Sequence, residues 1–340
     1  MKRLNAGVEE KLTMKSLIRK FAVGGFVLAL SFASFTLRQP GFGLVAFAQE
    51  TDDQAKIDMY KRFVDNRIPN PRVAYQAARD YLQKYSKEKD QYTDYLKQWV
   101  VFFERDDRKL KLPVLIYNDK NFAEAYRVGG QILTDEPNYL RAQIDLGYAG
   151  YLATSEKNEA FNTDALGYAH KAIQALEGGK SPADWAPFKG KEDTLAYLYY
   201  TVGFLNLKSA PDQAIEPLIK AAQFESDLKK APSIYYFLAV AYQNGPYKTL
   251  SSAYQTTYAN KPETPESKAA LEKLNVTIDR MIDAYARAIA AAGTDPKNAQ
   301  NKTQWLATLT SFYKFRHQDS DAGLNEFIAA ALSKPLPPKP

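Results

Sequence analysis

Residues 121–150 read NFAEAYRVGGQILTDEPNYLRAQIDLGYAG and contain two amphipathic helical patterns that meet at a turn. In the first pattern Ala125, Gly129 and Ile132 fall at three- and four-residue steps, which place side chains on one face of a helix. Pro137 ends this helix, because proline lacks the N–H and the conformational freedom that a continuing helix needs. The stretch therefore predicts the junction between two packed helices.

The second pattern carries Leu146 and Gly147, and a glycine at this point lets a neighbouring helix approach closely. A small residue at the same spacing returns in three later segments, and Gly203 lies at the centre of another predicted helix. These segments contain Ala165, Ala169 and Ala172, then Ala214, Leu218 and Ala221, and finally Ala284, Ala288 and Ala291. Faces of this kind cannot be buried by one hairpin alone, so they predict an all-α fold of stacked helical hairpins.

Composition narrows the functional classes. The chain has 340 residues, 45% of them hydrophobic, and no cysteine, which excludes disulfides, thiolate metal sites and cysteine nucleophiles. The net charge is +6, but seven basic and two acidic residues lie in residues 1–48, so the rest carries 38 basic and 37 acidic residues and a net charge of about +1. Nucleic-acid binding needs a basic face that neutralises phosphates, so we expect no nucleic-acid partner.

Residues 1–48 have the pattern of an export signal. Lys15, Arg19 and Lys20 precede an apolar run at residues 21–35, and Ala-Phe-Ala at residues 46–48 offers a cleavage site after Ala48. The alternative is an uncleaved membrane anchor, although the uninterrupted run is shorter than the roughly 20 residues that a spanning helix needs. Translation could start at Met1 or at Met14. We expect export to the periplasm or cell envelope, with membrane contact only through this segment if it is retained.

Residues 49–333 are expected to form one helical-repeat domain. Helices are predicted at 55–66, 73–85, 91–105, 163–177, 194–207, 212–225, 233–242, 266–292, 304–315 and 322–332, in addition to the two in residues 121–150. Residues 110–117 contain a proline and are expected to be extended or a single turn, and residues 247–265 a loop or short irregular helix. The proline-rich residues 334–340 are expected to form an extended, mobile tail.

The spacings resemble the tetratricopeptide repeat, in which an aromatic residue, Leu, a small residue and Tyr mark the first helix and Ala and Pro mark the second. Tyr235, Leu238, Ala239 and Tyr242 match the first helix. Leu146 and Gly147 match its centre, and Pro137 and Pro296 match the later proline. The resemblance implies an α-α superhelix of roughly five to six hairpins with a concave groove.

Two further segments, VAYQAARDYLQKY at residues 73–85 and SFYKFRHQDSDAGLNEFIAAALSKPLP at residues 311–337, resemble exported tetratricopeptide-type proteins of environmental bacteria. That group has no specific function attached to it. The resemblance therefore implies a fold and a compartment, and the ligand has to be sought among the residues of the first helices.

In such a superhelix the first helices line the groove, and residues one turn from the contact face project into it. The candidates are Arg141, Tyr148, Tyr151, Tyr197, Tyr200, Phe204, Asn206, Tyr236 and Gln243. Aromatic rings supply contact area and amides pair with backbone groups, a mixture that suits an extended peptide. The structural alternative is that these side chains pack between helices. A second functional alternative is a small-molecule or glycan pocket lined by Tyr148, Tyr200 and Trp185.

No catalytic motif accompanies these residues. The only histidines are His170 and His317, too few for a histidine metal site or a triad in a chain without cysteine, and no glycine-rich phosphate loop follows a strand. We therefore expect no catalytic residues, no metal and no cofactor. The sequence predicts an exported, non-enzymatic scaffold or adaptor that binds a protein or peptide.

Overall fold

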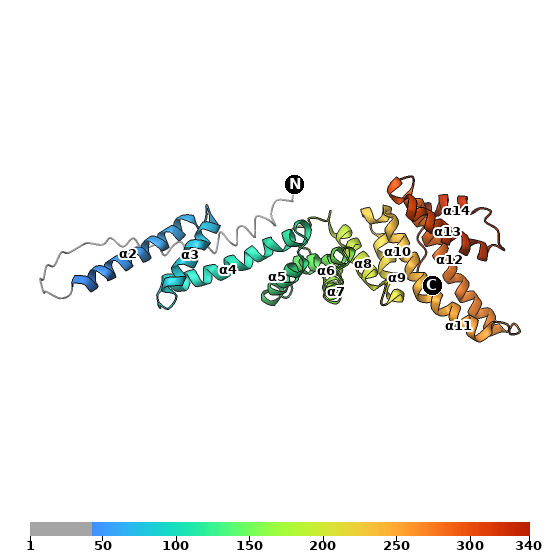
Figure 1. The fold of residues 1–340 in the computed structure, drawn as a ribbon, viewed down its shortest axis with the longest axis horizontal. Helices are drawn as coiled ribbons and strands as arrows, with labels where there is room; N and C mark the ends of the chain where they lie inside the picture. The colour runs from blue at the N-terminus through green and yellow to red at the C-terminus, as the bar shows by residue number, and fades with distance from the viewer. Residues whose placement is uncertain (1–42) are drawn as a thin grey trace. The chain divides into compact units, whose positions relative to one another are not determined.

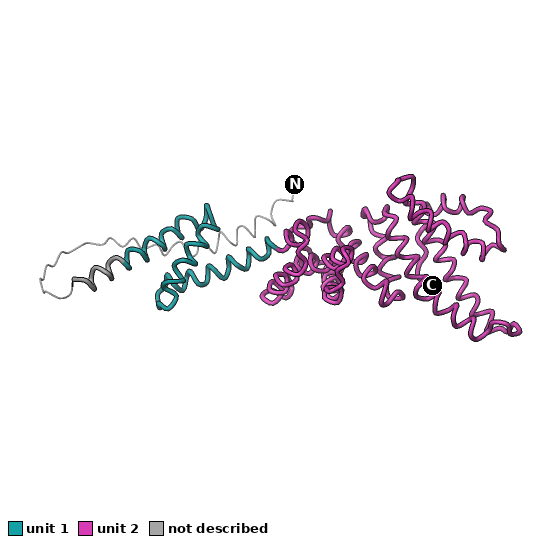
Figure 2. The backbone as a smooth tube through the Cα atoms, viewed as in Figure 1, with its two compact units in different colours: residues 1–111 teal, residues 112–340 magenta. Residues whose placement is uncertain are grey.

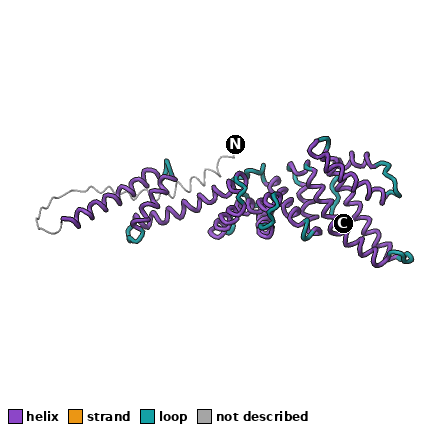
Figure 3. The backbone as a smooth tube through the Cα atoms, in the orientation of Figure 1, coloured by secondary structure: helices purple, strands orange, loops and turns teal. Residues whose placement is uncertain are grey.

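The computed structural model describes the backbone of residues 43–340 and the side chains from residue 52 onward. Within these residues every regular element is a helix, and there is no strand (Figure 3). The all-α prediction is therefore confirmed. Most of the predicted export segment lies outside the described residues, and the predicted cleavage position after Ala48 falls in the backbone of the first described helix, α2 (Gly43–Asn66).

The described chain forms two compact units, which divide at residues 111 and 112 (Figure 2). This boundary lies inside the predicted domain 49–333. Unit 1 consists of α2, α3 (Pro71–Tyr85) and most of α4 (Gln91–Pro113). α3 begins at a proline, whose missing N–H costs nothing in a first turn. Phe63, Tyr81 and Leu96, one from each helix, are fully buried and form the centre of this unit's core.

Unit 2 follows in chain order (Figure 1). Its elements are η1 (Val114–Asn118), α5 (Phe122–Asp135), α6 (Leu140–Ser155), α7 (Asn162–Glu177), α8 (Lys191–Asn206), α9 (Pro211–Gln223), η2 (Asp227–Lys230), α10 (Pro232–Tyr242), η3 (Gln243–Tyr247), α11 (Lys248–Tyr258), α12 (Pro265–Ala292), η4 (Pro296–Asn298), α13 (Ala299–Arg316), α14 (Leu324–Ala330) and η5 (Ala331–Ser333). α6 packs on α7, α8 on α9, α10 on α12 and α12 on α13, so neighbours in sequence are neighbours in space. This order gives unit 2 the layered arrangement of an all-α superhelix.

Glycines on the first helices make the close crossings. A Cβ placed on Gly147 of α6 would lie 3.0 Å from the backbone of Ala169 on α7, and one on Gly203 of α8 would lie 2.5 Å from Leu218 on α9. A side chain at either position would meet atoms of the facing helix. The predicted pairing of small-residue faces is therefore confirmed at these two crossings.

The junction in residues 121–150 is built as its sequence indicates. Asn121 caps α5 by accepting a hydrogen bond from the backbone N–H of Glu124, and Pro137 lies in the turn before α6. Gly129 leaves the space that the side chain of Leu146 fills, since a Cβ on Gly129 would lie 2.6 Å from it. The bulk at this crossing is thus supplied by α6.

The remaining predicted repeat positions lie in the core. Ala125, Leu146, Ala165, Ala214, Tyr235, Leu238, Ala239, Tyr242 and Ala284 are all buried. Pro296 opens the short helix η4 after α12. A single large cluster of buried apolar side chains runs from α6 to η5, and a smaller one joins the end of α4, α5 and α6.

Residues 110–117, expected to be extended or a single turn, are not extended. α4 continues to Pro113, and η1 carries the chain on as a wider helical turn to Asn118. Leu112, Leu115 and Ile116 share one face and are buried, so the helical form gains apolar contacts that an extended link would lack. The wider turn after Pro113 accommodates the break that this proline makes in the hydrogen-bond ladder.

The tail at residues 334–340 also differs from its prediction. It is extended at its start, with Lys334 at φ −95° and ψ 149°. It is not free, however, because the guanidinium groups of Arg280 and Arg287 on α12 donate hydrogen bonds to its backbone carbonyls. The sequence around the tail gave no sign of these arginines as its partners.

Candidate partner-binding face

Each of the helices α6, α8 and α10 contributes two aromatic side chains to a common surface. Tyr148 and Tyr151 come from α6, Tyr197 and Phe204 from α8, and Tyr236 and Phe237 from α10. All six are partly exposed, and we refer to them together as the aromatic face. The rings come together because α6 packs on α8 and α8 contacts α10.

Ring contacts connect the aromatic face without a gap. The ring centroids of Tyr148 and Tyr197 are 5.5 Å apart, and those of Tyr151 and Phe204 are 5.1 Å apart. Phe204 and Phe237 are also 5.1 Å apart, which joins α8 to α10. Edge-to-face and tilted pairs at these separations are favourable packings for aromatic rings. The face is therefore a pre-formed surface, with little side-chain freedom left to lose on binding.

The face continues onto α13 through a residue that the sequence did not single out. Trp305 is stacked on Tyr236 with a centroid separation of 4.9 Å, although Trp305 itself is buried. Phe237, on α10, is also absent from the predicted groove residues. It directly follows Tyr236, and helical periodicity alone assigns adjacent residues to different faces. The Tyr235-Tyr236-Phe237 run was the available signal, because three consecutive aromatics on an 11-residue helix cover most of its circumference.

Two predicted groove residues are buried. Tyr200 is 1% exposed and its hydroxyl donates to Ser233 Oγ at 3.2 Å, while Asn206 is 9% exposed and its side-chain amide donates to the Val202 carbonyl at 2.9 Å. Both side chains therefore pack between helices and do not project toward solvent. The helical period that selects them also selects core positions, because a helix enclosed by neighbours on several sides buries more than one stripe.

Gln243 and Arg141 are engaged by neighbouring side chains. The Gln243 carbonyl oxygen accepts a hydrogen bond of 2.6 Å from the Tyr285 hydroxyl. Arg141 Nε donates to Asp145 Oδ2 at 2.7 Å, and Arg141 also bonds the backbone carbonyl of Asp184 at 3.1 Å. The Arg141 guanidinium therefore neutralises the carboxylate of Asp145 and is not free to bind a carboxylate of a partner.

Asp145 is the most deeply buried ionisable group in this region, with a side chain that is 0% exposed. The Tyr117 hydroxyl donates to its Oδ1 at 2.8 Å and Arg141 to its Oδ2. Burial raises the pKa of Asp145 to about 6, and the charge and hydrogen bonds of Arg141 and Tyr117 oppose part of that rise. The network holds η1, which carries Tyr117, and α6 at a fixed spacing beside Tyr148, whose ring centroid is 6.4 Å from that of Tyr117.

A second buried carboxylate lies near the same end of the aromatic face. Asp193, in the first turn of α8, is 6% exposed and accepts a hydrogen bond of 2.9 Å from the Lys189 backbone N–H through Oδ2. Its Oδ1 has no hydrogen-bond partner among the described residues. Asp193 adds to burial in raising the pKa of the Tyr148 and Tyr197 phenols, so its charge acts on both rings. Asp193 therefore acts electrostatically on both rings, and the nearby cation of Lys189 opposes its effect on Tyr197.

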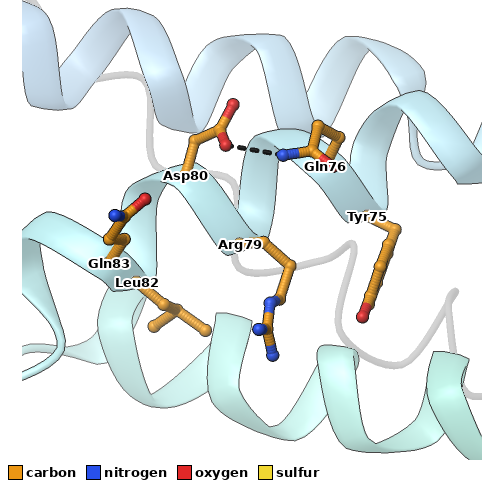
Figure 4. A pocket seen from close by; sticks show the side chains of 6 residues that line it. All are labelled: Tyr75, Gln76, Arg79, Asp80, Leu82 and Gln83. Atoms are coloured by element: carbon orange, nitrogen blue, oxygen red, sulfur yellow. Dashed lines mark hydrogen bonds between the residues drawn. The ribbon is translucent and has the colours of Figure 1, made fainter.

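Unit 1 holds a separate hollow with a volume of about 710 Å³ along α3 (Figure 4). Its six lining residues are Tyr75, Gln76, Arg79, Asp80, Leu82 and Gln83. Gln76 donates to Asp80 at 2.7 Å, and Tyr75 donates to Glu104 of α4 at 2.7 Å. These polar side chains are therefore paired with one another or with α4.

Neither histidine lines this hollow. His170 is exposed on α7, and His317 is stacked on Tyr313 with its Nδ1 2.8 Å from the Tyr313 carbonyl oxygen. Among the side chains that the structure describes, from residue 52 onward, no group of three or more His, Cys, Asp or Glu residues could hold a metal ion. Over the same residues, none of the helices combines the length and the hydrophobicity needed to cross a bilayer.

Comparison with known proteins adds no assignment, because no protein-family model, curated protein or solved structure matches the chain significantly. The class defined by the fold is that of an all-α protein whose helices pack in sequence order. Within that class, the aromatic face and its surroundings are the features that bear on function.

Proposed function

We propose that the chain is an exported, non-enzymatic scaffold of the tetratricopeptide type that binds a protein or peptide partner through the aromatic face. The observation that carries the proposal is the unbroken series of partly exposed rings on α6, α8 and α10. Rings that are already fixed by one another lose little entropy on binding, and aromatic residues supply a large share of the energy at protein interfaces. The tetratricopeptide spacings around Leu146 and Leu238 support the same reading.

The chemistry of the face indicates the kind of segment it would bind. Tyrosine hydroxyls at Tyr148, Tyr151 and Tyr236 can pair with a peptide backbone, while Phe204 and Phe237 offer apolar contact. The Asp193 carboxylate, which acts electrostatically on Tyr148 and Tyr197, favours a basic or neutral side chain at the corresponding position of the partner. The small-molecule alternative receives less support, because Tyr200, one of its three predicted lining residues, is buried in helix packing.

Export is the second part of the proposal. It rests on the basic, apolar and small-residue order of residues 15–48, with cleavage after Ala48. A mature chain recovered from its native host should then begin at Gln49 in the periplasm or cell envelope. Recovery of a chain that retains residues 1–48 in the cytoplasm would contradict export.

The partner-binding proposal is tested by affinity capture with paired variants. The full chain is immobilised and incubated with envelope extract from the native host, alongside a Tyr151→Ala/Tyr236→Ala double variant. We expect at least one protein that the wild type retains and the double variant loses, because the two substitutions remove rings at both halves of the face. Phe315→Ala is the matched control, since Phe315 is 60% exposed on α13 and lies outside the face.

The control should retain the same protein as the wild type. All three chains must also show the same helical circular dichroism, so that loss of binding is separated from loss of fold. Equal retention by the wild type and the double variant would contradict a role for the aromatic face.

A further inference from the structure

The proline-rich tail of this chain is held on α12 by a buried arginine. Arg287 is 3% exposed, and its Nε donates to Asp283 Oδ2 at 2.7 Å, which balances its charge. Its two remaining nitrogens donate to tail carbonyls, Nη1 to Lys334 at 3.1 Å and Nη2 to Pro335 at 2.8 Å. Burying a guanidinium is costly unless its N–H groups are hydrogen-bonded. Arg287 directs both terminal nitrogens at backbone carbonyls, so it is arranged to bind an extended segment.

Arg280 repeats the interaction two turns earlier in α12. Its Nε donates to the Pro338 carbonyl at 3.1 Å, so the tail runs antiparallel to the helix. Seven residues of α-helix rise about 10.5 Å, and the three residues from Pro335 to Pro338 rise about 9.3 Å in a polyproline II conformation. The two arginines are therefore spaced to reach carbonyls one polyproline II turn apart.

The tail sequence itself enforces that conformation. Residues 334–340 read KPLPPKP, in which proline fixes its own φ and biases the residue before it toward extended or polyproline II geometry. Proline also lacks an N–H, so a proline-rich segment offers mainly carbonyl acceptors, and arginine offers only donors. Leu336, between the two arginine contacts, is partly buried against the main apolar cluster and supplies a side-chain anchor.

A cavity of about 410 Å³ lies where the tail ends, lined by residues of α9, α10, α11 and α12 together with Lys339 and Pro340. Tyr242 in its wall is 1% exposed, and its hydroxyl has no hydrogen-bond partner among the described residues. An unpaired buried hydroxyl beside a cavity is a donor ready for an acceptor. Asp212 and Glu272 are the carboxylates of the lining, and the ammonium group of Lys339 in the tail donates to the Asp212 backbone carbonyl at 3.4 Å.

We propose that Arg280, Asp283, Arg287 and Tyr242 form a binding site, the α12 seat, for a proline-rich basic segment of a partner protein. Residues 334–340 are then its intramolecular ligand. The site goes beyond the proposed function, because it uses none of the residues of the aromatic face. A partner segment of the same type has to displace the tail, so the tail lowers the apparent affinity of the seat by the fraction of time that it occupies it.

The test uses the full chain and a fluorescein-labelled peptide, KPLPPKP, followed by fluorescence anisotropy. A Pro335→Ser/Pro337→Ser/Pro338→Ser variant weakens the tail's own hold and leaves the seat intact. We expect this open variant to bind the peptide at least about tenfold more tightly than the wild type. The peptide KSLSSKS, which lacks the polyproline II bias, should bind neither chain.

Adding Arg280→Ala to the open variant should weaken peptide binding by about tenfold or more, since one charge-assisted hydrogen bond is lost. Arg127→Ala is the matched control, because Arg127 lies on α5 and pairs with Glu124 at the surface. Arg280 is chosen over Arg287 because it is only half-buried, and thermal melting checks that each variant remains folded.

Equal peptide affinity in the wild type and the open variant would overturn the proposal, as would binding that Arg280→Ala leaves unchanged. A concentration-dependent dimer of the wild-type chain that excess peptide dissociates would also overturn it. In that case the seat would serve the tail of a second copy and not a partner protein.

Discussion

At the scale of single residues, Asp145 shows how the chain tolerates a charge in its interior. The carboxyl has Arg141 and Tyr117 as donors, and its burial is complete. A buried ion pair of this kind contributes little net stability, yet removal of one partner leaves the other unpaired. We interpret the network as positioning Tyr148, because it ties α6, which carries this ring, to η1, which carries Tyr117.

The raised pKa of Asp145 has a consequence for stability. Between its ordinary value of 3.8 and about 6, the folded chain keeps a proton on Asp145 that the unfolded chain has lost. Stability from this group is therefore present at low pH and is lost as the pH rises toward 6. Relative to an Asp145→Asn variant, the free energy of unfolding of the wild type should fall by up to about 3 kcal/mol between pH 4 and pH 7.

Urea denaturation of both chains at several pH values measures this difference. Asp184→Asn serves as the control, since the Asp184 side chain is 73% exposed and should give a nearly constant difference. A constant difference between the Asp145→Asn variant and the wild type across this range would show that Asp145 titrates normally.

At the scale of helices, the glycines of α6 and α7 make a matched pair for testing the hairpin crossing. A Cβ on Gly147 would meet the backbone of Ala169 at 3.0 Å, whereas one on Gly167 of α7 would have nothing within 4 Å. Gly147→Ala should destabilise the chain by about 1–3 kcal/mol through overpacking. Gly167→Ala should stabilise it by about 0.5–1 kcal/mol, because alanine is the better helix former.

Chemical denaturation monitored by circular dichroism gives both values. The opposite signs are the decisive feature, since a general preference for alanine in helices would stabilise both variants. Two stabilised variants would mean that α6 and α7 do not cross at Gly147.

The same scale shows what periodicity could predict. Residues 163–177 and 266–292 were placed within one residue of the observed α7 and α12, because their apolar spacing is regular and their ends carry clear stop signals. Residues 110–117 differ from their prediction. Pro113 favours a break in the helix locally, whereas the burial of Leu115 and Ile116 depends on contacts with α5 and α6. Propensity is a local property, and tertiary packing overrode it here.

At the scale of the whole molecule, the all-α class followed from the sequence, but the division near residue 111 did not. α4 runs through that boundary as a continuous helix, so no loop or change of composition marks it. The candidate site was predicted in part. Tyr148, Tyr151, Tyr197, Phe204 and Tyr236 lie in the aromatic face, whereas Tyr200 and Asn206 are packing residues and Phe237 was missed.

The attachment of the tail to α12 is the clearest example of a feature that the sequence pattern alone does not predict. Arg287 and Pro335 are 48 residues apart, and their contact depends on where α13 and α14 turn the chain back onto α12. Composition alone predicts a proline-rich, extended segment, and Lys334 at its start has extended backbone angles. Its attachment to α12 depends on the tertiary structure.

The most direct test of the central claim, that the aromatic face binds a protein partner, is site-specific photo-crosslinking in the native host. A benzophenone amino acid replaces Tyr236 in one chain and Phe315 in another, and the products are identified by mass spectrometry from the cell-envelope fraction. We predict a protein adduct from position 236, carried by a chain that begins at Gln49, and none from position 315. Absence of an adduct from position 236, or the same adducts from both positions, would contradict the account.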